Sequence, residues 1–183
     1  MQKVKKIKDV EFAHGLKLDI YVPDACASTF IYFHGGGLES GDKSDAAVFA
    51  DVLAEKGIAV VSANYRMYPD AAYPDFIEDA AAAVAWVYYN ADLYGLSKKI
   101  FAGGSSAGGY LSMMLCFAPE FLKQKDVKTD DIAGYVFDAG QPTVHFNVLR
   151  ERGLDCRRII VDEAAPLYYV GTADNYPPML IIV

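Results

Sequence analysis

The feature that most constrains the fold is the segment Gly103-Gly104-Ser105-Ser106-Ala107-Gly108-Gly109, which joins two apolar runs. Ile100-Phe101-Ala102 precedes it, and Tyr110-Leu111-Ser112-Met113 follows it. This order predicts a strand, a sharp glycine turn and a helix. Within the turn, the spacing Gly104-x-Ser106-x-Gly108 is typical of a strained strand-to-helix turn that exposes a serine hydroxyl. Ser106 is therefore the candidate nucleophile.

Physical chemistry explains why glycines should flank this serine. The turn holds the nucleophile in an unfavourable backbone region and brings other chain close to it, so a Cβ on either side would collide. A helix that starts here also points free N–H groups at the reacting centre. Phosphate loops fit poorly, because Tyr110 stands where a Walker loop needs lysine and Ser105 where a dinucleotide loop needs glycine. A purely structural glycine turn remains an alternative.

A second glycine motif, His34-Gly35-Gly36-Gly37, directly follows the apolar run Phe30-Ile31-Tyr32-Phe33. Consecutive glycines allow backbone N–H groups to turn toward a ligand oxygen, which an oxyanion hole made of main chain requires. The sequence predicts Gly36 and Gly37 as donors, with Ala107 supplying a third N–H.

With both motifs in this order, the chain resembles an α/β-hydrolase of the esterase/lipase group that contains hormone-sensitive-lipase-like and carbohydrate esterases. The segments Glu39-Ser40-Gly41-Asp42-Lys43-Ser44 and Asn64-Tyr65-Arg66-Met67-Tyr68-Pro69 also resemble that group, and the likeness runs from about Val10 to Val183. Ser105 departs from the acidic residue often found before the nucleophile in the hormone-sensitive-lipase branch.

The resemblance implies a serine carboxylic ester hydrolase that acts through an acyl-enzyme on Ser106, without a cofactor, on a small-molecule ester such as an acetyl or carbohydrate ester. It also implies that His34 supports the glycine loop and does not take the serine proton. Gly35, Gly104 and Gly108 have the same supporting role. A non-catalytic, hydrolase-like ligand-binding protein is the alternative from another class.

The composition limits which classes of binding partner and which cellular compartment we expect for this chain. The net charge of −7 leaves no basic stripe for a phosphate backbone, so nucleic acid is excluded as an expected partner. No apolar stretch is long enough for a signal peptide or a membrane span, so no membrane partner is expected. The three cysteines, Cys26, Cys116 and Cys156, suit reduced, buried thiols in the cytoplasm. The three histidines are isolated from one another in the sequence, so no bound metal is expected. The sequence is also compatible with a homo-oligomer.

The hydrophobic pattern predicts one α/β domain over 1–183, with a mostly parallel sheet, helices on both faces and an antiparallel hairpin at the start. Strands are expected at 4–12, 16–22, 30–33, 58–63, 99–102, 132–137 and 179–183. Helices are expected at about 44–56, with Val48, Phe49, Val52 and Leu53 on one face, at 74–94 and at 106–117. Residues 141–176 break the pattern and predict a small cap insertion, which is either a solvated surface segment or a lid that shapes the pocket.

The end of the sequence leads to a further expectation. The sequence ends at Val183, within a predicted apolar strand. In the family that the chain resembles, the acid of the Ser-acid-His catalytic triad follows that strand, and the histidine follows one strand later. The domain is therefore expected to be C-terminally incomplete, with both groups beyond Val183, and the 183-residue chain alone is expected to be inactive. A less favoured alternative uses Asp138 and His145, which satisfy the same order.

Overall fold

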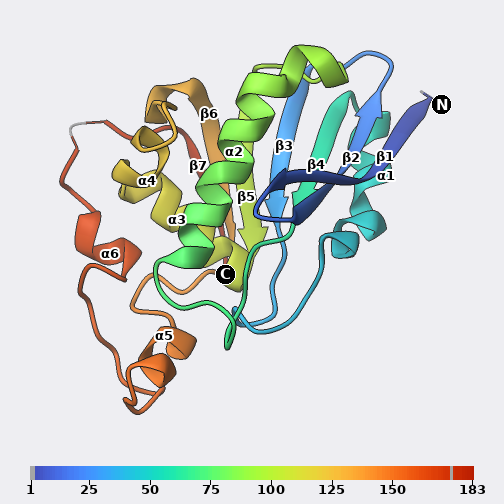
Figure 1. Ribbon diagram of the computed structural model, residues 1–183. Helices are drawn as coiled ribbons and strands as arrows, with labels where there is room; N and C mark the ends of the chain where they lie inside the picture. The colour runs from blue at the N-terminus through green and yellow to red at the C-terminus, as the bar shows by residue number, and fades with distance from the viewer. Residues whose placement is uncertain (1–2, 174) are drawn as a thin grey trace.

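A mixed sheet forms the centre of the protein in the computed structural model, which describes residues 3–173 and 175–183 (Figure 1). The sheet has seven strands in the order β1-β2-β4-β3-β5-β6-β7. The strands are β1 (Val4–Ala13), β2 (Leu16–Pro23), β3 (Ser28–Phe33), β4 (Ile58–Ala63), β5 (Ile100–Ser105), β6 (Ile132–Asp138) and β7 (Met179–Ile182). The helices are α1 (Ala47–Glu55), α2 (Asp75–Tyr94), α3 (Ala107–Phe117), α4 (Glu120–Lys123), α5 (Phe146–Glu151) and α6 (Pro166–Tyr169), with short 3-10 turns at Lys43–Ala46 and Thr129–Asp131.

The strand directions follow the prediction from the sequence. β1 and β2 pair antiparallel, with a turn at His14-Gly15 between them, and β2 pairs antiparallel with β4. All other neighbours, from β4 through β3, β5 and β6 to β7, are parallel. The carboxyl ends of β3 and β5 therefore lie side by side, because Phe33 pairs with Gly104. This register brings the two glycine motifs to the same edge of the sheet.

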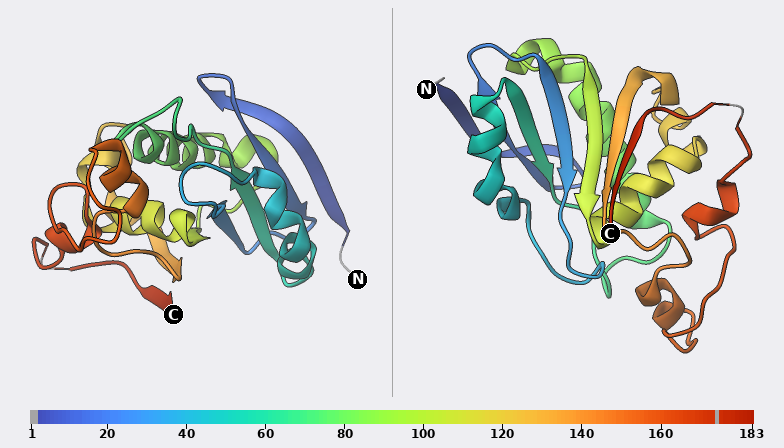
Figure 2. Two further views of the ribbon diagram at one scale, coloured as in Figure 1. Left: turned by 90° about the horizontal axis from the view of Figure 1, so that it is seen from below. Right: turned by 180° about the vertical axis from the view of Figure 1, so that it is seen from behind.

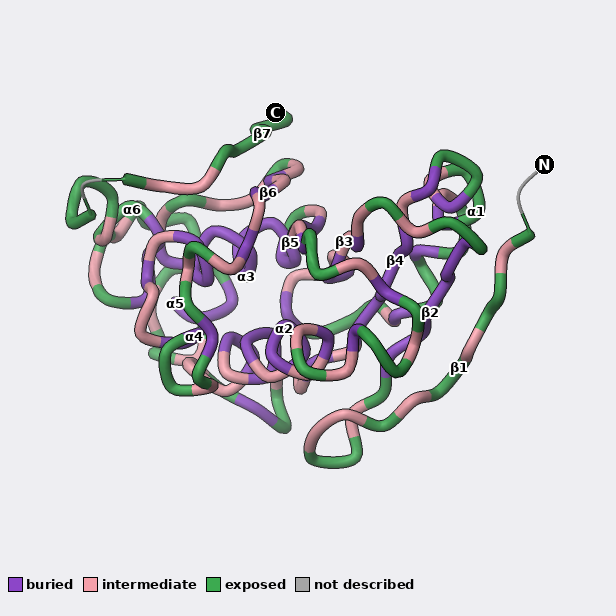
Figure 3. Tube along the Cα trace, turned by 90° about the horizontal axis from the view of Figure 1, so that it is seen from above, coloured by how far each residue is buried: buried purple, intermediate pink, exposed green. Residues whose placement is uncertain are grey.

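Helices cover the two faces of the sheet unequally. Viewed from above, α2 and α3 lie on one face, while α1 lies on the other, over the β2 and β4 side (Figure 3). The two further views show the same division (Figure 2). In α2 the apolar residues that recur at helical spacing are all fully buried, namely Phe76, Ala80, Val84, Val87 and Ala91. The helix ends as predicted at Gly95, which takes the left-handed conformation that glycine tolerates.

The predicted apolar face of α1 is wrong for Val48 and Val52, whereas Phe49 and Leu53 are half-buried and pack against buried residues. Val48 and Val52 are 85% and 55% exposed, while Ala46, Ala50 and Ala54 are fully buried. These alanines recur every four residues, so they form one stripe of small side chains that can lie close to the sheet. Larger side chains lie at the margin of this stripe; the ring of Phe49 meets Tyr32 edge-on at 4.9 Å between ring centroids. In α1, small side chains are therefore buried in preference to larger apolar ones, and a search for large hydrophobic residues does not detect them.

The segment between β6 and β7, predicted as a cap, contains the short helices α5 and α6 on the left of the ribbon drawing (Figure 1). The strand that follows, β7, forms the sheet edge, and its residues Met179 to Ile182 are all exposed. Within the described residues, no helix combines the length and apolar character needed to cross a membrane.

The cysteines differ from one another in their surroundings. All are free thiols, but Cys116 is buried, Cys26 is half-buried and Cys156 is exposed. The prediction that all of them behave as buried small hydrophobes is therefore wrong for Cys156, which lies in the charged segment between α5 and α6.

Candidate active site

Ser106 occupies the strained turn that the sequence predicts. It lies between β5 and α3 with φ 53° and ψ −112°, a conformation that side-chain-bearing residues rarely adopt. Its backbone N–H donates to the carbonyl of Asp138 at 2.7 Å, which ties the turn to the end of β6. The residue itself is exposed, while Ala107 and the rest of the first turn of α3 are buried. The chain therefore presents one serine hydroxyl at the amino end of an 11-residue helix.

The flanking glycines are required by close packing against β3. A Cβ on Gly108 would overlap the carbonyl oxygen of Phe33, and a Cβ on Gly104 would overlap the same atom. Gly35 approaches the turn from the other motif, since a Cβ built on it would lie 3.5 Å from the Cβ of Ser106. The two glycine motifs are therefore in direct contact, and their glycines make that approach possible.

In the loop after β3, two peptide carbonyls form hydrogen bonds within the loop, while the N–H groups of the same peptides point away from it. The Gly35 carbonyl accepts from His34 Nδ1 at 2.7 Å, and the Gly36 carbonyl accepts from Ser40 N at 3.1 Å and Ser40 Oγ at 3.0 Å. In a trans peptide the C=O and the following N–H point in opposite directions, so these contacts direct the N–H groups of Gly36 and Gly37 outward. Among the described residues, neither these two N–H groups nor that of Ala107 donates a hydrogen bond.

His34 holds this loop from inside the protein. Its ring is completely buried and stacks on Tyr65, with 4.4 Å between the ring centroids. A carbonyl oxygen can only accept, so the contact with Gly35 makes Nδ1 the protonated nitrogen. Burial lowers the pKa of this imidazole, which keeps it neutral, although the bond to Gly35 acts in the opposite direction. These contacts are those of a residue that shapes the loop.

Side chains that follow β4 support the same loop, and the spacing of the motifs does not predict their roles. Tyr65 donates its hydroxyl proton to the His34 carbonyl at 2.9 Å, and it is itself almost fully buried. Asn64 donates to Asp42 at 2.9 Å and accepts from the backbone N–H of Lys43 at 2.6 Å. Partial burial alone would raise the pKa of Asp42, but hydrogen bonds from Asn64 and Ser44 and the charge of Lys43 hold it well below its usual range. Arg66 pairs with buried Asp79 on α2.

The alternative acid and base within the chain are not brought together. His145 is 2% exposed and caps the start of α5, where its Nδ1 accepts the backbone N–H of Asn147 at 3.2 Å. Burial lowers its pKa to about 4. Asp138 ends β6, and its backbone carbonyl is the group that contacts Ser106. Among the described residues, no hydrogen bond links His145 to Asp138, or any histidine to the Ser106 hydroxyl.

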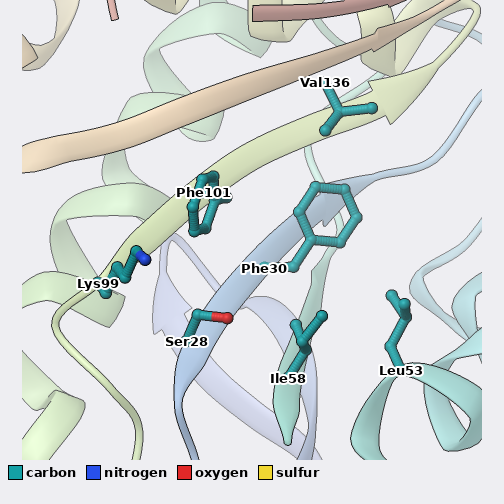
Figure 4. Close-up of a pocket in the computed structure, with 7 residues that line it drawn as sticks. All are labelled: Ser28, Phe30, Leu53, Ile58, Lys99, Phe101 and Val136. Atoms are coloured by element: carbon teal, nitrogen blue, oxygen red, sulfur yellow. The ribbon is translucent and has the colours of Figure 1, made fainter. Parts of the chain in front are cut away.

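A cavity of about 470 Å³ lies elsewhere, on the sheet face that carries α1. Figure 4 shows Phe30 and Phe101 facing it from β3 and β5, with Leu53 of α1 at its margin. Ser28, Ile58 and Lys99 place it toward the amino ends of the strands. Because Ser106 lies at the carboxyl ends, this cavity is separate from the candidate site. No cluster of histidine, cysteine and carboxylate groups suited to a metal ion occurs in the described part of the chain.

The chain superposes on solved structures that include esterases. The chain superposes on a bacterial heroin esterase with a TM-score of 0.73 at 20% identity, covering 98% of this chain and 65% of that one. It also superposes on esterase B from Lactobacillus rhamnosis with a TM-score of 0.80 at 20% identity, covering 97% and 64%. The chain therefore has the α/β-hydrolase fold, as the resemblance in the sequence predicts.

Sequence comparison then assigns the family. A family model described as BD-FAE matches residues 18–148, and the chain belongs to the BD-FAE family. It is 37% identical over 95 residues to the AB hydrolase superfamily protein C1039.03 of Schizosaccharomyces pombe, covering 51% of this chain and 28% of that protein. It is 40% identical over 88 residues to carboxylesterase NlhH of Mycobacterium tuberculosis, covering 46% and 27%. The matched parts thus span only about a quarter of these curated relatives.

Proposed function

We propose that the full-length protein is a serine carboxylic ester hydrolase. The observation that carries this proposal is the contact between two motifs at one sheet edge: the exposed Ser106, held at φ 53°, and the glycine loop whose Gly35 packs against it. Relatives named as a carboxylesterase, a lipase and esterases support the same reaction class.

The proposed chemistry begins with attack of Ser106 Oγ on the carbonyl carbon of an ester. A general base takes the hydroxyl proton, and negative charge develops on the former carbonyl oxygen. The N–H groups of Gly36, Gly37 and Ala107 stabilise that charge, helped by the amino end of α3. Collapse of this tetrahedral species transfers the proton to the leaving alcohol and leaves the acyl group on Ser106. Water then attacks the acyl-enzyme by the same route.

We infer that the base and its orienting acid come from chain that follows Val183 in the full-length protein. His34 is occupied with the glycine loop, and His145 caps α5. The third histidine, His14, lies in the turn of the opening hairpin. We further propose that the segment 141–176 forms the cap of the pocket and that the substrates are small esters, such as acetyl or carbohydrate esters.

Steady-state hydrolysis of p-nitrophenyl acetate tests this proposal in the full-length protein. Ser106→Ala should lower kcat by about five to six orders of magnitude, because removal of the nucleophile disables the whole catalytic unit. The matched control is Ser97→Ala, which also removes a serine hydroxyl but at the amino end of β5. Hydrolysis that survives in Ser106→Ala, or its absence in the natural protein despite saturable ester binding, would contradict the proposal; the second result favours a binding protein.

A further inference from the structure

Helix α5 is tied to the glycine loop by contacts that span a long stretch of sequence. Asn147 Nδ2 donates to the carbonyl oxygen of Gly37 at 2.6 Å, although the two residues are 110 positions apart. The side chain of Phe146 lies against the same glycine, since a Cβ on Gly37 would come within 2.9 Å of its ring. Farther along α5, Arg150 forms an ion pair with Glu39 of the loop.

The Asn147 bond closes a gap in how the loop is fixed. His34 and Ser40 hold the carbonyls of Gly35 and Gly36, and neither of them contacts the carbonyl of Gly37. Gly37 has φ +67° and no side chain, so it can rotate about its own bonds at little steric cost. A hydrogen bond to its carbonyl fixes the peptide that follows Gly37, so it anchors the end of the loop that carries the N–H groups of Gly36 and Gly37.

The burial of Asn147 argues against a role in stability alone. The residue is fully buried, and among the described residues its Oδ1 has no hydrogen-bond partner. A buried polar atom without a partner destabilises the folded state, so an apolar residue of similar size would suit a purely structural position better. What the amide provides at this position is its hydrogen bond to the Gly37 carbonyl.

We infer that Asn147 is a positioning residue for the oxyanion hole, by which the cap segment holds the glycine loop in its productive shape. This inference rests on the proposed esterase function. Loss of the Asn147 bond lets Gly37 leave the conformation in which its N–H and that of Gly36 converge on the oxyanion. Binding of the uncharged ester depends less on those donors than the transition state does, so the effect falls mainly on kcat.

Two variants test the donor in the full-length protein. Asn147→Asp keeps the shape of the side chain, and Asn147→Leu keeps its approximate volume without charge; both remove the N–H donor. Each should lower kcat for p-nitrophenyl acetate about 10- to 100-fold, with KM within about twofold, since loss of a direct oxyanion donor costs about 10²–10³-fold. Titration with a fluorophosphonate counts the competent sites, so kcat is expressed per reactive serine and misfolded protein does not contribute.

Asn90→Asp is the matched control, because Asn90 Nδ2 also donates to a backbone carbonyl, that of Trp86 at 2.8 Å, but on α2. It should leave kcat and KM unchanged. Unchanged kcat per reactive serine in both Asn147 variants would overturn the positioning role while leaving the esterase proposal intact. A loss in the Asp variant alone would assign the effect to the new charge and also overturn it. Absence of Ser106-dependent hydrolysis in the natural protein would instead refute the proposed function, and this inference with it.

Discussion

Replacing Ser106 by glycine should stabilise the protein relative to replacement by alanine. Both substitutions remove the hydroxyl, but only glycine removes the Cβ that makes φ 53° and ψ −112° unfavourable. Strain in such a region costs about 1–3 kcal/mol. The glycine variant loses about 0.5–1 kcal/mol of this relief of strain, because glycine gives the unfolded protein more conformational freedom than alanine does. The Ser106→Gly variant should therefore have a free energy of unfolding about 1 kcal/mol above that of Ser106→Ala.

Urea unfolding of the two variants, followed by circular dichroism, measures this difference. For a protein of this size, 1 kcal/mol corresponds to a midpoint shift of about 0.4 M, at a slope of about 2–3 kcal/mol/M. Ser44 supplies the control, because it is exposed, lies in a 3-10 turn and has no positive φ. There the order should reverse, with Ser44→Gly less stable than Ser44→Ala. If Ser106→Gly were the less stable of its pair, the turn would store no strain.

Three further predictions follow from burial and packing. His145 is buried with its pKa lowered to about 4 from 6.5, so its contribution to stability is complete above pH 6.5 and is lost as the pH falls toward 4. Between these pH values the natural protein should lose up to about 3 kcal/mol more free energy of unfolding than His145→Gln does, measured by urea unfolding; equal losses would contradict this. Cys156 should react with a disulfide reagent in the native protein, whereas buried Cys116, its pKa raised to about 12 by burial, should react only on unfolding; equal native rates would exclude this burial pattern. Gly108→Ala should destabilise the fold by about 3 kcal/mol, since its Cβ would overlap the Phe33 carbonyl; a thermal midpoint at or above that of the natural protein would rule out this close contact.

Local patterns in the sequence were sufficient to predict most of the fold. Each predicted strand is present, and Gly57 and Gly95 end their helices as expected. These features depend on apolar periodicity and on backbone freedom at glycine, both of which are visible within a few residues. Val48 and Val52 of α1 were mispredicted because small alanines lie against the sheet there, and a single sequence does not show how closely a helix approaches its sheet.

In the candidate site, too, local features were predictable from the sequence and long-range contacts were not. The positions of Ser106 and of the glycines follow from motif spacing, because each motif is local. The contacts of Tyr65 with His34 and of Asn147 with Gly37 join residues 31 and 110 positions apart, and no spacing rule predicts such pairs. The only available signal was the likeness of the Asn64-Tyr65-Arg66 segment to the family, and it indicated no contact.

The most direct test of this account is to locate the covalent adduct that a fluorophosphonate forms with the full-length protein. After proteolysis, mass spectrometry of the peptide that contains residues 103–109 should show one phosphonyl group on Ser106, and Ser106→Ala should show none. An adduct on another residue, or rapid ester hydrolysis without any adduct at Ser106, would contradict the assignment of this serine as the nucleophile.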